Sequence, residues 1–259
     1  MEPEVPARGV ISLSMRLSPM QELETGRGGV AIVMDDLTEE KQREAQLAAV
    51  RRYLPPAMVD NIQSIDMLAL GGEQRTISVV SADVRGFSTF SEQLAPEVLM
   101  DIINRYLRCS TDAIHLHEGV VDKYIGDEVV GLFNTQLNPQ EDHAVRAVRA
   151  ALSMRYDVLA LHEVLSEAHR LYYGIGVHTG PAVLGNVGSP DRKEFTAVGD
   201  TLQVAKFMES NAQAGEVMLS EATFALVKDY FETEPLKPRK LNGRTDIRVM
   251  YRVIGVKRP

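Results

Sequence analysis

The stretch ISVVSADVRGFS (residues 77–88) decides the fold, because it is a buried apolar run that ends at an aspartate and then turns at a glycine. Residues 77–82 have the apolar pattern of a strand covered on both faces. Asp83 then stands at the mouth of the strand, and Gly86 permits a tight turn into a helix. Such a loop directs backbone N–H groups towards an anion, and a carboxylate beside it is a typical magnesium ligand at a triphosphate. A second interpretation remains open, in which Asp83 only caps the loop.

A second motif, VDKYIGDE (residues 121–128), predicts two strands joined by a tight hairpin. Gly126 takes the first central position of a two-residue turn, where a positive φ is favoured. By its local chemistry Asp127 is a turn residue. It becomes a metal ligand if the hairpin tip lies beside Asp83, and two aspartates so placed can bind two magnesium ions.

The order of predicted elements around these motifs is β-α-ββ-α-β with extensions. This order predicts an α+β fold of the ferredoxin-like, split βαβ type, in which helices cover one face of a mostly antiparallel sheet. Besides the two motifs, the pattern predicts helices at 96–117, about 140–165, about 201–210 and 221–227, and strands at 172–178, 182–187, 217–219 and 248–253.

The segment before this domain predicts a hairpin followed by a helix. Residues 10–16 and 29–34 are strand candidates, and Thr38 is a candidate N-cap. In the helix that follows, Leu47, Val50 and Leu54 have the spacing of a coiled-coil seam, which ends at a Pro-Pro pair before a short helical stretch at 57–65. These features resemble the last strands of a PAS sensor domain with its signalling helix. The alternative is a hairpin with no sensory role.

Composition excludes several functional classes. The 259 residues carry a net charge of −8, which argues against a sequence-independent grip on nucleic acid or on an anionic membrane. Cys109 is the only cysteine, so an intrachain disulfide is excluded and a reducing compartment is expected. No apolar run approaches the roughly 20 residues of a membrane span, and we expect a cytoplasmic protein. We interpret His143 and His178 as packing or surface residues rather than ligands.

Four blocks together resemble a known family. SADVRGFS (81–88), VDKYIGDE (121–128), GIGVHTG (174–180) and FTAVGDT (195–201) look in order and spacing like the signatures of class III adenylyl and guanylyl cyclases, over about two thirds of the chain. The resemblance divides the chain into a PAS-like fragment (1–38), a signalling helix and transducer linker (39–72) and a nucleotide cyclase catalytic domain (73–259).

The resemblance implies a role for several residues. Two aspartates of the family bind two Mg²⁺ or Mn²⁺ ions per site, and they match Asp83 and Asp127. The lysine and threonine that contact the purine match Lys123 and Thr196. That pair selects adenine, which makes ATP the implied substrate, and it belongs to a subgroup reported to respond to bicarbonate.

The substrate-binding loop implied by the family comprises Val84, Arg85, Gly86, Phe87 and Ser88. Family members bind ATP between two subunits, so the resemblance implies a homodimer with two equivalent sites. The ribose 3′-hydroxyl then attacks the α-phosphate and expels pyrophosphate, a reaction that depends on positioning and on charge stabilisation.

The sequence departs from the family at three catalytic positions. Gln203 and Phe207 replace an asparagine that orients the ribose and an arginine that stabilises the pentavalent phosphate. Asn242 replaces a phosphate-binding lysine, Arg244 keeps a charge near that position, and Lys240 is an alternative cation of the same segment. The helical turn predicts that Lys206 points away from this face.

Two functional hypotheses therefore remain. One is an adenylate cyclase that is weak or conditional and is controlled by the N-terminal sensor. The other is a catalytically silent cyclase-like module that dimerises or binds nucleotide, with Phe207 serving the core. A diguanylate cyclase is disfavoured, because the Gly126-Asp127-Glu128 hairpin lacks that family's first glycine and its phenylalanine.

Overall fold

The computed structural model describes residues 4–5, 9–21, 28–51, 72–189, 193–240 and 247–257. The chain divides into two compact units, Met1–Leu54 and Pro55–Pro259.

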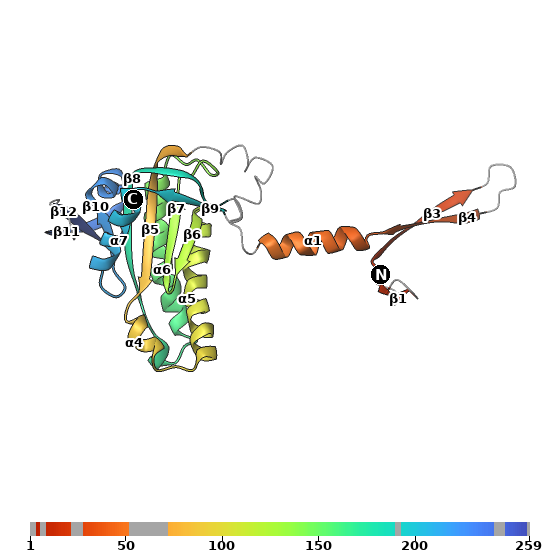
Figure 1. Ribbon diagram of the computed structural model, residues 1–259, viewed down its shortest axis with the longest axis horizontal. Coiled ribbons are helices and arrows are strands. Elements are labelled where there is room, and N and C mark those ends of the chain that lie inside the picture. Colours follow the sequence, from red (N-terminus) through yellow and green to blue (C-terminus); the bar gives the residue numbers. More distant parts are fainter. Residues whose placement is uncertain are drawn as a thin grey trace. The chain divides into compact units, whose positions relative to one another are not determined.

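The first unit contains the predicted hairpin and helix (Figure 1). Its elements are β1 (Glu4–Val5), β2 (Gly9–Val10), β3 (Leu13–Gln21), β4 (Gly28–Asp36) and α1 (Thr38–Arg51), with β3 and β4 paired antiparallel. Thr38 is the first helical residue rather than the N-cap. Asp36 Oδ1 accepts from Thr38 N at 3.0 Å, while Thr38 Oγ1 accepts from Ser12 N at 2.9 Å. The side chains of the predicted coiled-coil seam lie outside the described part of the structure. The predicted helical stretch at 57–65 lies outside it as well.

The second unit has the predicted α+β fold, built on one eight-stranded sheet. The strand order is β11-β12-β10-β8-β5-β7-β6, with β9 paired to β8, and only the β8–β10 pair is parallel. The strands are β5 (Glu73–Val84), β6 (Val120–Ile125), β7 (Glu128–Phe133), β8 (Tyr173–Gly188), β9 (Lys193–Val198), β10 (Val217–Ser220), β11 (Phe231–Lys240) and β12 (Ile247–Val256). The helices are α4 (Phe87–Ser91), α5 (Pro96–Leu116), α6 (His143–His162), η1 (Glu167–His169), α7 (Asp200–Asn211) and α8 (Glu221–Val227).

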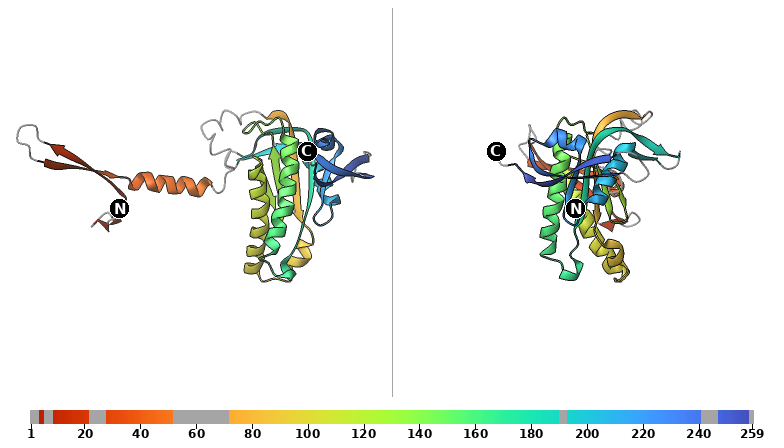
Figure 2. Two further views of the ribbon diagram at one scale, coloured as in Figure 1. Left: turned by 180° about the vertical axis from the view of Figure 1, so that it is seen from behind. Right: turned by 90° about the vertical axis from the view of Figure 1, so that its left-hand side faces the viewer.

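Helices lie on both faces of this sheet, whereas the sequence predicted them on one face (Figures 1 and 2). Alternation along β5 shows why. Val80 and Ala82 pack with α5 and α6, whereas Ile77 and Val79 point to the other side and pack with Ala205 of α7. Both faces of β5 are apolar, so each requires a cover.

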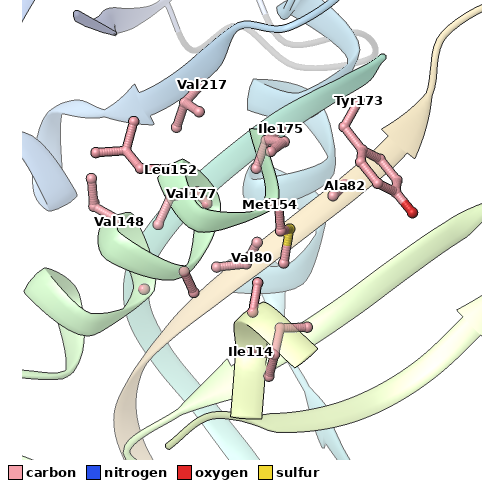
Figure 3. Packing of buried hydrophobic residues seen from close by; sticks show 14 of the residues in the cluster. Val80, Ala82, Ile114, Val148, Leu152, Met154, Tyr173, Ile175, Val177 and Val217 are labelled. Atoms are coloured by element: carbon pink, nitrogen blue, oxygen red, sulfur yellow. The ribbon is translucent and has the colours of Figure 1, made fainter. Parts of the chain in front are cut away.

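The larger core lies under α5 and α6 (Figure 3). Ile114 and Met154 come from these helices and meet Val80 of β5 and Ile175 of β8, all of them at most 1% exposed. This packing fixes β5 and its C-terminal end, where the chemistry-bearing residues begin.

A chain of buried hydrogen bonds crosses the sheet and confirms that the two histidines have packing roles. His143 Nδ1 lies 2.9 Å from Ser78 Oγ, and His178 Nδ1 lies 2.6 Å from Ser220 Oγ. The links between them are Ser78–Thr179, Thr179–Thr223 and Thr223–Ser220.

Three strand predictions differ from the structure. The strands expected at 172–178 and 182–187 form the single long strand β8, because Gly180 and Pro181 continue the pairing with β5 instead of turning. Strands β9 and β11 were not expected. β11 carries Pro235, Pro238 and five charged residues, a composition tolerated only at the edge of a sheet.

Gly176 brings α7 into backbone contact with β8, so we expect Gly176→Ala to destabilise the fold. The new Cβ would fall well inside van der Waals contact with the backbone of Ala205 and Glu209. Overpacking against backbone costs about 2 kcal/mol or more. Urea denaturation followed by circular dichroism measures the loss. Gly255→Ala is the matched control, since its Cβ meets nothing within 4 Å and should change stability by less than about 0.5 kcal/mol. Equal effects of the two changes would contradict this account.

Candidate functional site

Two carboxylates meet at one end of the central strands. Asp83 ends the buried part of β5, and Asp127 lies at the tip of the β6–β7 hairpin, where Gly126 has the positive φ that the turn requires. The backbone N–H of Val84 donates to Asp127 Oδ2 at 3.2 Å, which ties the hairpin tip to the β5 loop. Burial, and then the charge of Asp83, raises the pKa of Asp127. The structure therefore brings together the two predicted aspartates.

Arg85 connects this carboxylate pair to α7. Its Nη1 lies 2.9 Å from Asp83 Oδ2, and its Nη2 lies 2.6 Å from Glu209 Oε1. The guanidinium also donates to the carbonyl oxygens of Glu209 and Ala212. A side chain at Gly174 would occupy the space of this guanidinium, so the glycine of β8 makes the bridge possible.

The remaining loop residues make structural contacts. The N–H of Val84 is bound to Asp127, and Phe87 packs against the core beneath α5 and α6. Gly86 has a φ of 78°, which favours glycine, and Ser88 is exposed at the start of α4. Of the five loop residues predicted to bind substrate, Ser88 and Gly86 are thus the two whose surfaces are open.

A second polar cluster lies on β6 and β9. Lys123 Nζ donates to Thr196 Oγ1 at 3.1 Å and lies 3.3 Å from Asp122 Oδ2. Thr196 Oγ1 in turn donates to the same Asp122 oxygen at 3.1 Å. The structure thus places the predicted lysine and threonine in direct contact. Asp122, which the sequence did not single out, joins them.

A pocket of about 870 Å³ opens beside Lys123, on the face of the sheet that α7 covers. Gln203, Lys206 and Phe207 of α7 line it together with Arg239 of β11. The expectation that Lys206 points away from this face is wrong, because residues three apart on a helix share a face and Lys206 follows Gln203 by three.

The cations of this pocket differ in their pairing. Lys206 Nζ lies 2.7 Å from Glu209 Oε2 and 3.0 Å from Glu128 Oε2, so its charge is balanced. Arg239 donates to the neutral amide of Asn211 at 2.8 Å and, within the described ranges, pairs with no carboxylate. The predicted residue Arg244 and the departure at Asn242 lie outside the described residues.

Phe207 combines a pocket surface with a core contact. It lines the pocket and also packs against the apolar cluster that contains Val204, Met208 and Met250. The side chain therefore has a packing role, in addition to occupying a position where a donor was expected.

The metal-binding capacity of the site rests on two carboxylates. Among the residues that the structure describes, no group of three or more His, Cys, Asp or Glu side chains could hold a metal ion. Asp83 and Asp127 nevertheless fit a divalent cation, because both are hard oxygen ligands and, besides burial, Asp83 is close enough to raise the pKa of Asp127. The sequence analysis also missed Glu128 and Glu209, since no local pattern indicates that they meet Lys206.

The described part of the chain contains no helix long and apolar enough to cross a membrane.

Comparison with known proteins identifies the second unit. Residues 72–255 match the family model described as Adenylate and Guanylate cyclase catalytic domain. The chain is 30% identical over 213 residues to Adenylate cyclase 1 of Rhizobium meliloti (strain 1021), covering 80% of this chain and 32% of that protein. It is 31% identical over 166 residues to an adenylate cyclase of Anabaena cylindrica, covering 63% and 33%. The chain spans about a third of the length of these relatives.

Solved structures of similar fold agree. The adenylyl cyclase CyaB from P. aeruginosa has a TM-score of 0.69 at 28% identity, with 73% of this chain and 98% of that chain covered. The guanylyl cyclase Cya2 has a TM-score of 0.68 at 30% identity, with 73% and 97% covered.

Arg85 is expected to be a main support of this site, so Arg85→Ala should destabilise the second unit by about 3 kcal/mol. The change leaves the Glu209 carboxylate, whose side chain is 1% exposed, without its guanidinium. Thermal and urea denaturation measure the loss.

Arg105→Ala is the control, because Arg105 forms only a surface pair with Asp101 and its loss should cost less than about 0.5 kcal/mol. Adding Glu209→Gln to Arg85→Ala removes the buried charge and should recover part of the stability. No recovery would show that the ion pair is not the cause.

Proposed function

The chain belongs to the family of adenylate and guanylate cyclase catalytic domains, and from this premise we propose that it is an adenylate cyclase, which converts ATP to cyclic AMP and pyrophosphate. Relatives named adenylate cyclase at about 30% identity support the choice of nucleotide. The observation that carries the proposal is the meeting of Asp83 with Asp127 at the edge of a site that also contains Lys123 and Thr196.

Asp83 and Asp127 are the proposed ligands of two Mg²⁺ or Mn²⁺ ions. Such ions, when bound, would activate the 3′-hydroxyl and stabilise charge on the leaving phosphates. The protein's own contribution is to hold the carboxylates in place. The N–H of Val84 fixes Asp127, and the guanidinium of Arg85 fixes Asp83. This order in the unloaded site reduces the reorganisation needed when ATP enters.

Lys123 and Thr196 are the proposed adenine contacts. The ammonium can donate to a ring nitrogen, and the hydroxyl can accept from the exocyclic amine. Lys123 is 37% exposed and lines the pocket, so it is accessible to a base. In the same pocket, Gln203 offers an amide to the ribose, and Arg239 offers a cation to the phosphates.

Two copies of the chain are proposed to form the active unit. In this arrangement the carboxylates of one protomer face the purine pocket of its partner, and a homodimer has two equivalent sites. Control by residues 1–72 as a PAS-like fragment and signalling helix, a response to bicarbonate and a cytoplasmic location stay predictions.

A second candidate is the silent nucleotide-binding module, which the placement of Phe207 favours. This side chain packs against the cluster that contains Val204 and Met208, at a position where a donor to the phosphate was expected. Loss of such a donor costs about 3 to 4 kcal/mol in the barrier, or roughly a hundred- to a thousandfold in rate. We therefore propose that activity, where present, is low.

Asp83→Ala should abolish the production of cyclic AMP, because it removes one of two metal carboxylates. The purified full chain is assayed with ATP and Mg²⁺, then with Mn²⁺, each with and without bicarbonate. The expected loss exceeds about a hundredfold, with the helical content unchanged in circular dichroism. Asp101→Ala, which removes an exposed carboxylate of α5, is the control and should keep full activity. Activity that survives in Asp83→Ala would contradict the assignment of Asp83 as a metal ligand.

Phe207→Arg combined with Gln203→Asn should raise the turnover at least about tenfold, because the arginine restores a charged donor on the pocket face of α7 and the asparagine returns the amide to the shorter stem of the family. The matched control is Phe207→Leu with Gln203→Asn, which retains an apolar side chain at the packing position. A gain in both variants would show that the guanidinium is not responsible. Binding of ATP without turnover by every variant would support the silent module instead.

A further inference from the structure

We propose that Asp122 is a specificity-determining residue, which makes the Thr196 hydroxyl a pure hydrogen-bond acceptor and so selects adenine over guanine. The inference rests on the proposed function, because it concerns the same purine pocket. It assigns a role to a residue that does not itself touch the base.

The chemistry of the three side chains fixes the direction of each hydrogen bond. A lysine ammonium can only donate, and an ionised carboxylate can only accept. Thr196 Oγ1 lies 3.1 Å from Lys123 Nζ and 3.1 Å from Asp122 Oδ2. The hydroxyl must therefore accept from the lysine and donate to the aspartate.

A competing acceptor for the hydroxyl proton is weaker. The carbonyl oxygen of Ala197 lies 3.5 Å from Thr196 Oγ1, at the limit of hydrogen bonding. The carboxylate is both nearer and charged, and charge-assisted hydrogen bonds are the stronger ones. Asp122 therefore holds the only proton of Thr196.

The hydroxyl is left with one lone pair and no proton to offer. Adenine presents an exocyclic amine, which donates, and a ring nitrogen, which accepts from Lys123. Guanine presents an oxygen in place of the amine and an N–H in place of the ring nitrogen. Both of its groups would then meet a partner of the same polarity, and an unmatched polar pair inside a site is strongly rejected.

The burial of Asp122 indicates that stability is not the reason for a carboxylate at this position. Its side chain is fully buried, and its Oδ1 has no hydrogen-bond partner among the described residues. Burial raises the pKa of this carboxyl, a direction that marks the cost of keeping the charge there. A buried ion pair is weak evidence for stability, and the contacts that this carboxylate does make orient Thr196 and Lys123.

The test is the preference of the full chain for ATP over GTP, measured as the ratio of the two kcat/KM values. Asp122→Asn has the same shape, but its amide can donate to Thr196, which frees the hydroxyl proton to meet the oxygen of guanine. We expect the ATP-to-GTP ratio to fall at least about tenfold. The urea concentration at the midpoint of unfolding should remain equal to that of the wild type. Asp122→Ala, which leaves the hydroxyl without a charged acceptor, should lower the ratio in the same direction.

The controls separate orientation from a general structural role. Asp101→Asn makes the same chemical change on the exposed face of α5 and should keep the wild-type ratio. In a Thr196→Val background no hydroxyl remains to be oriented, so adding Asp122→Asn should leave the ratio of that background unchanged. Equal losses for ATP and GTP in Asp122→Asn, or a wild-type ratio in folded Asp122→Ala, would overturn the proposal.

Calorimetric binding of the α,β-methylene analogues of ATP and GTP distinguishes this inference from the proposed function. A chain that makes no cyclic AMP but binds the ATP analogue selectively refutes the cyclase activity, and the variants then test Asp122 through binding alone. A wild type that binds both analogues equally refutes the inference whatever its activity. Binding of neither analogue refutes both.

Discussion

The site depends first on the guanidinium of Arg85. It contacts both the carboxylate at the end of β5 and the C-terminal turn of α7, where it meets Glu209 and the Ala212 carbonyl. Asp83, one of the metal-ligand candidates, lies at the end of the first of these elements, and Gln203 and Phe207 of the pocket lie on the second. Besides apolar packing, the pair of Lys206 with Glu128 also joins α7 to the sheet, but the bridge of Arg85 is the one that reaches Asp83, and directed charged hydrogen bonds set a distance more sharply than packing does. Gly174 shows that β8 is shaped around the bridge.

The domain contains two charged clusters with different compositions. One brings two carboxylates together, and the other pairs a lysine with an aspartate. At the hairpin tip, Asp83 and Asp127 are held near each other at an electrostatic cost, which a cation would relieve. At Lys123, the charge is already balanced by Asp122, and the lysine itself lines the pocket. An unbalanced cluster is suited to ions and a balanced cluster to a neutral base. The β6–β7 hairpin contributes to both clusters: Asp122 and Lys123 lie on β6, and Asp127 lies at the tip of the hairpin.

The elements with a clear local signal could be predicted from the sequence. The buried run of β5, the amphipathic helix α5 and the Gly-Asp hairpin all lie where the pattern indicates. Asp83, Asp127, Lys123 and Thr196 were found through the motifs that surround them. Their contacts agree with the motif-based expectations, whereas their catalytic roles stay predictions.

The rest was hidden because its signal is tertiary. Glu209 looks like an ordinary helix residue until its burial beside Arg85 is known, and Asp122 looks like a strand-edge carboxylate until β9 supplies Thr196. The prediction for Lys206 was wrong because its direction was compared with that of the adjacent Phe207. The relevant comparison is with Gln203, which lies about one helical turn earlier. The two-sided cover of the sheet was missed because apolar residues on both faces of β5 do not say which helix takes which face.

The composition of β11 also governs how the protein behaves in a crowded solution. This strand forms one border of the sheet, and a border normally offers a row of free N–H groups on which a foreign extended peptide can assemble. Pro235 and Pro238 remove two of those donors, and the glutamates and basic residues of the strand would lose their hydration if a second strand packed beside them. The same residues that concealed the strand from sequence patterns thus protect the domain from amyloid-like growth.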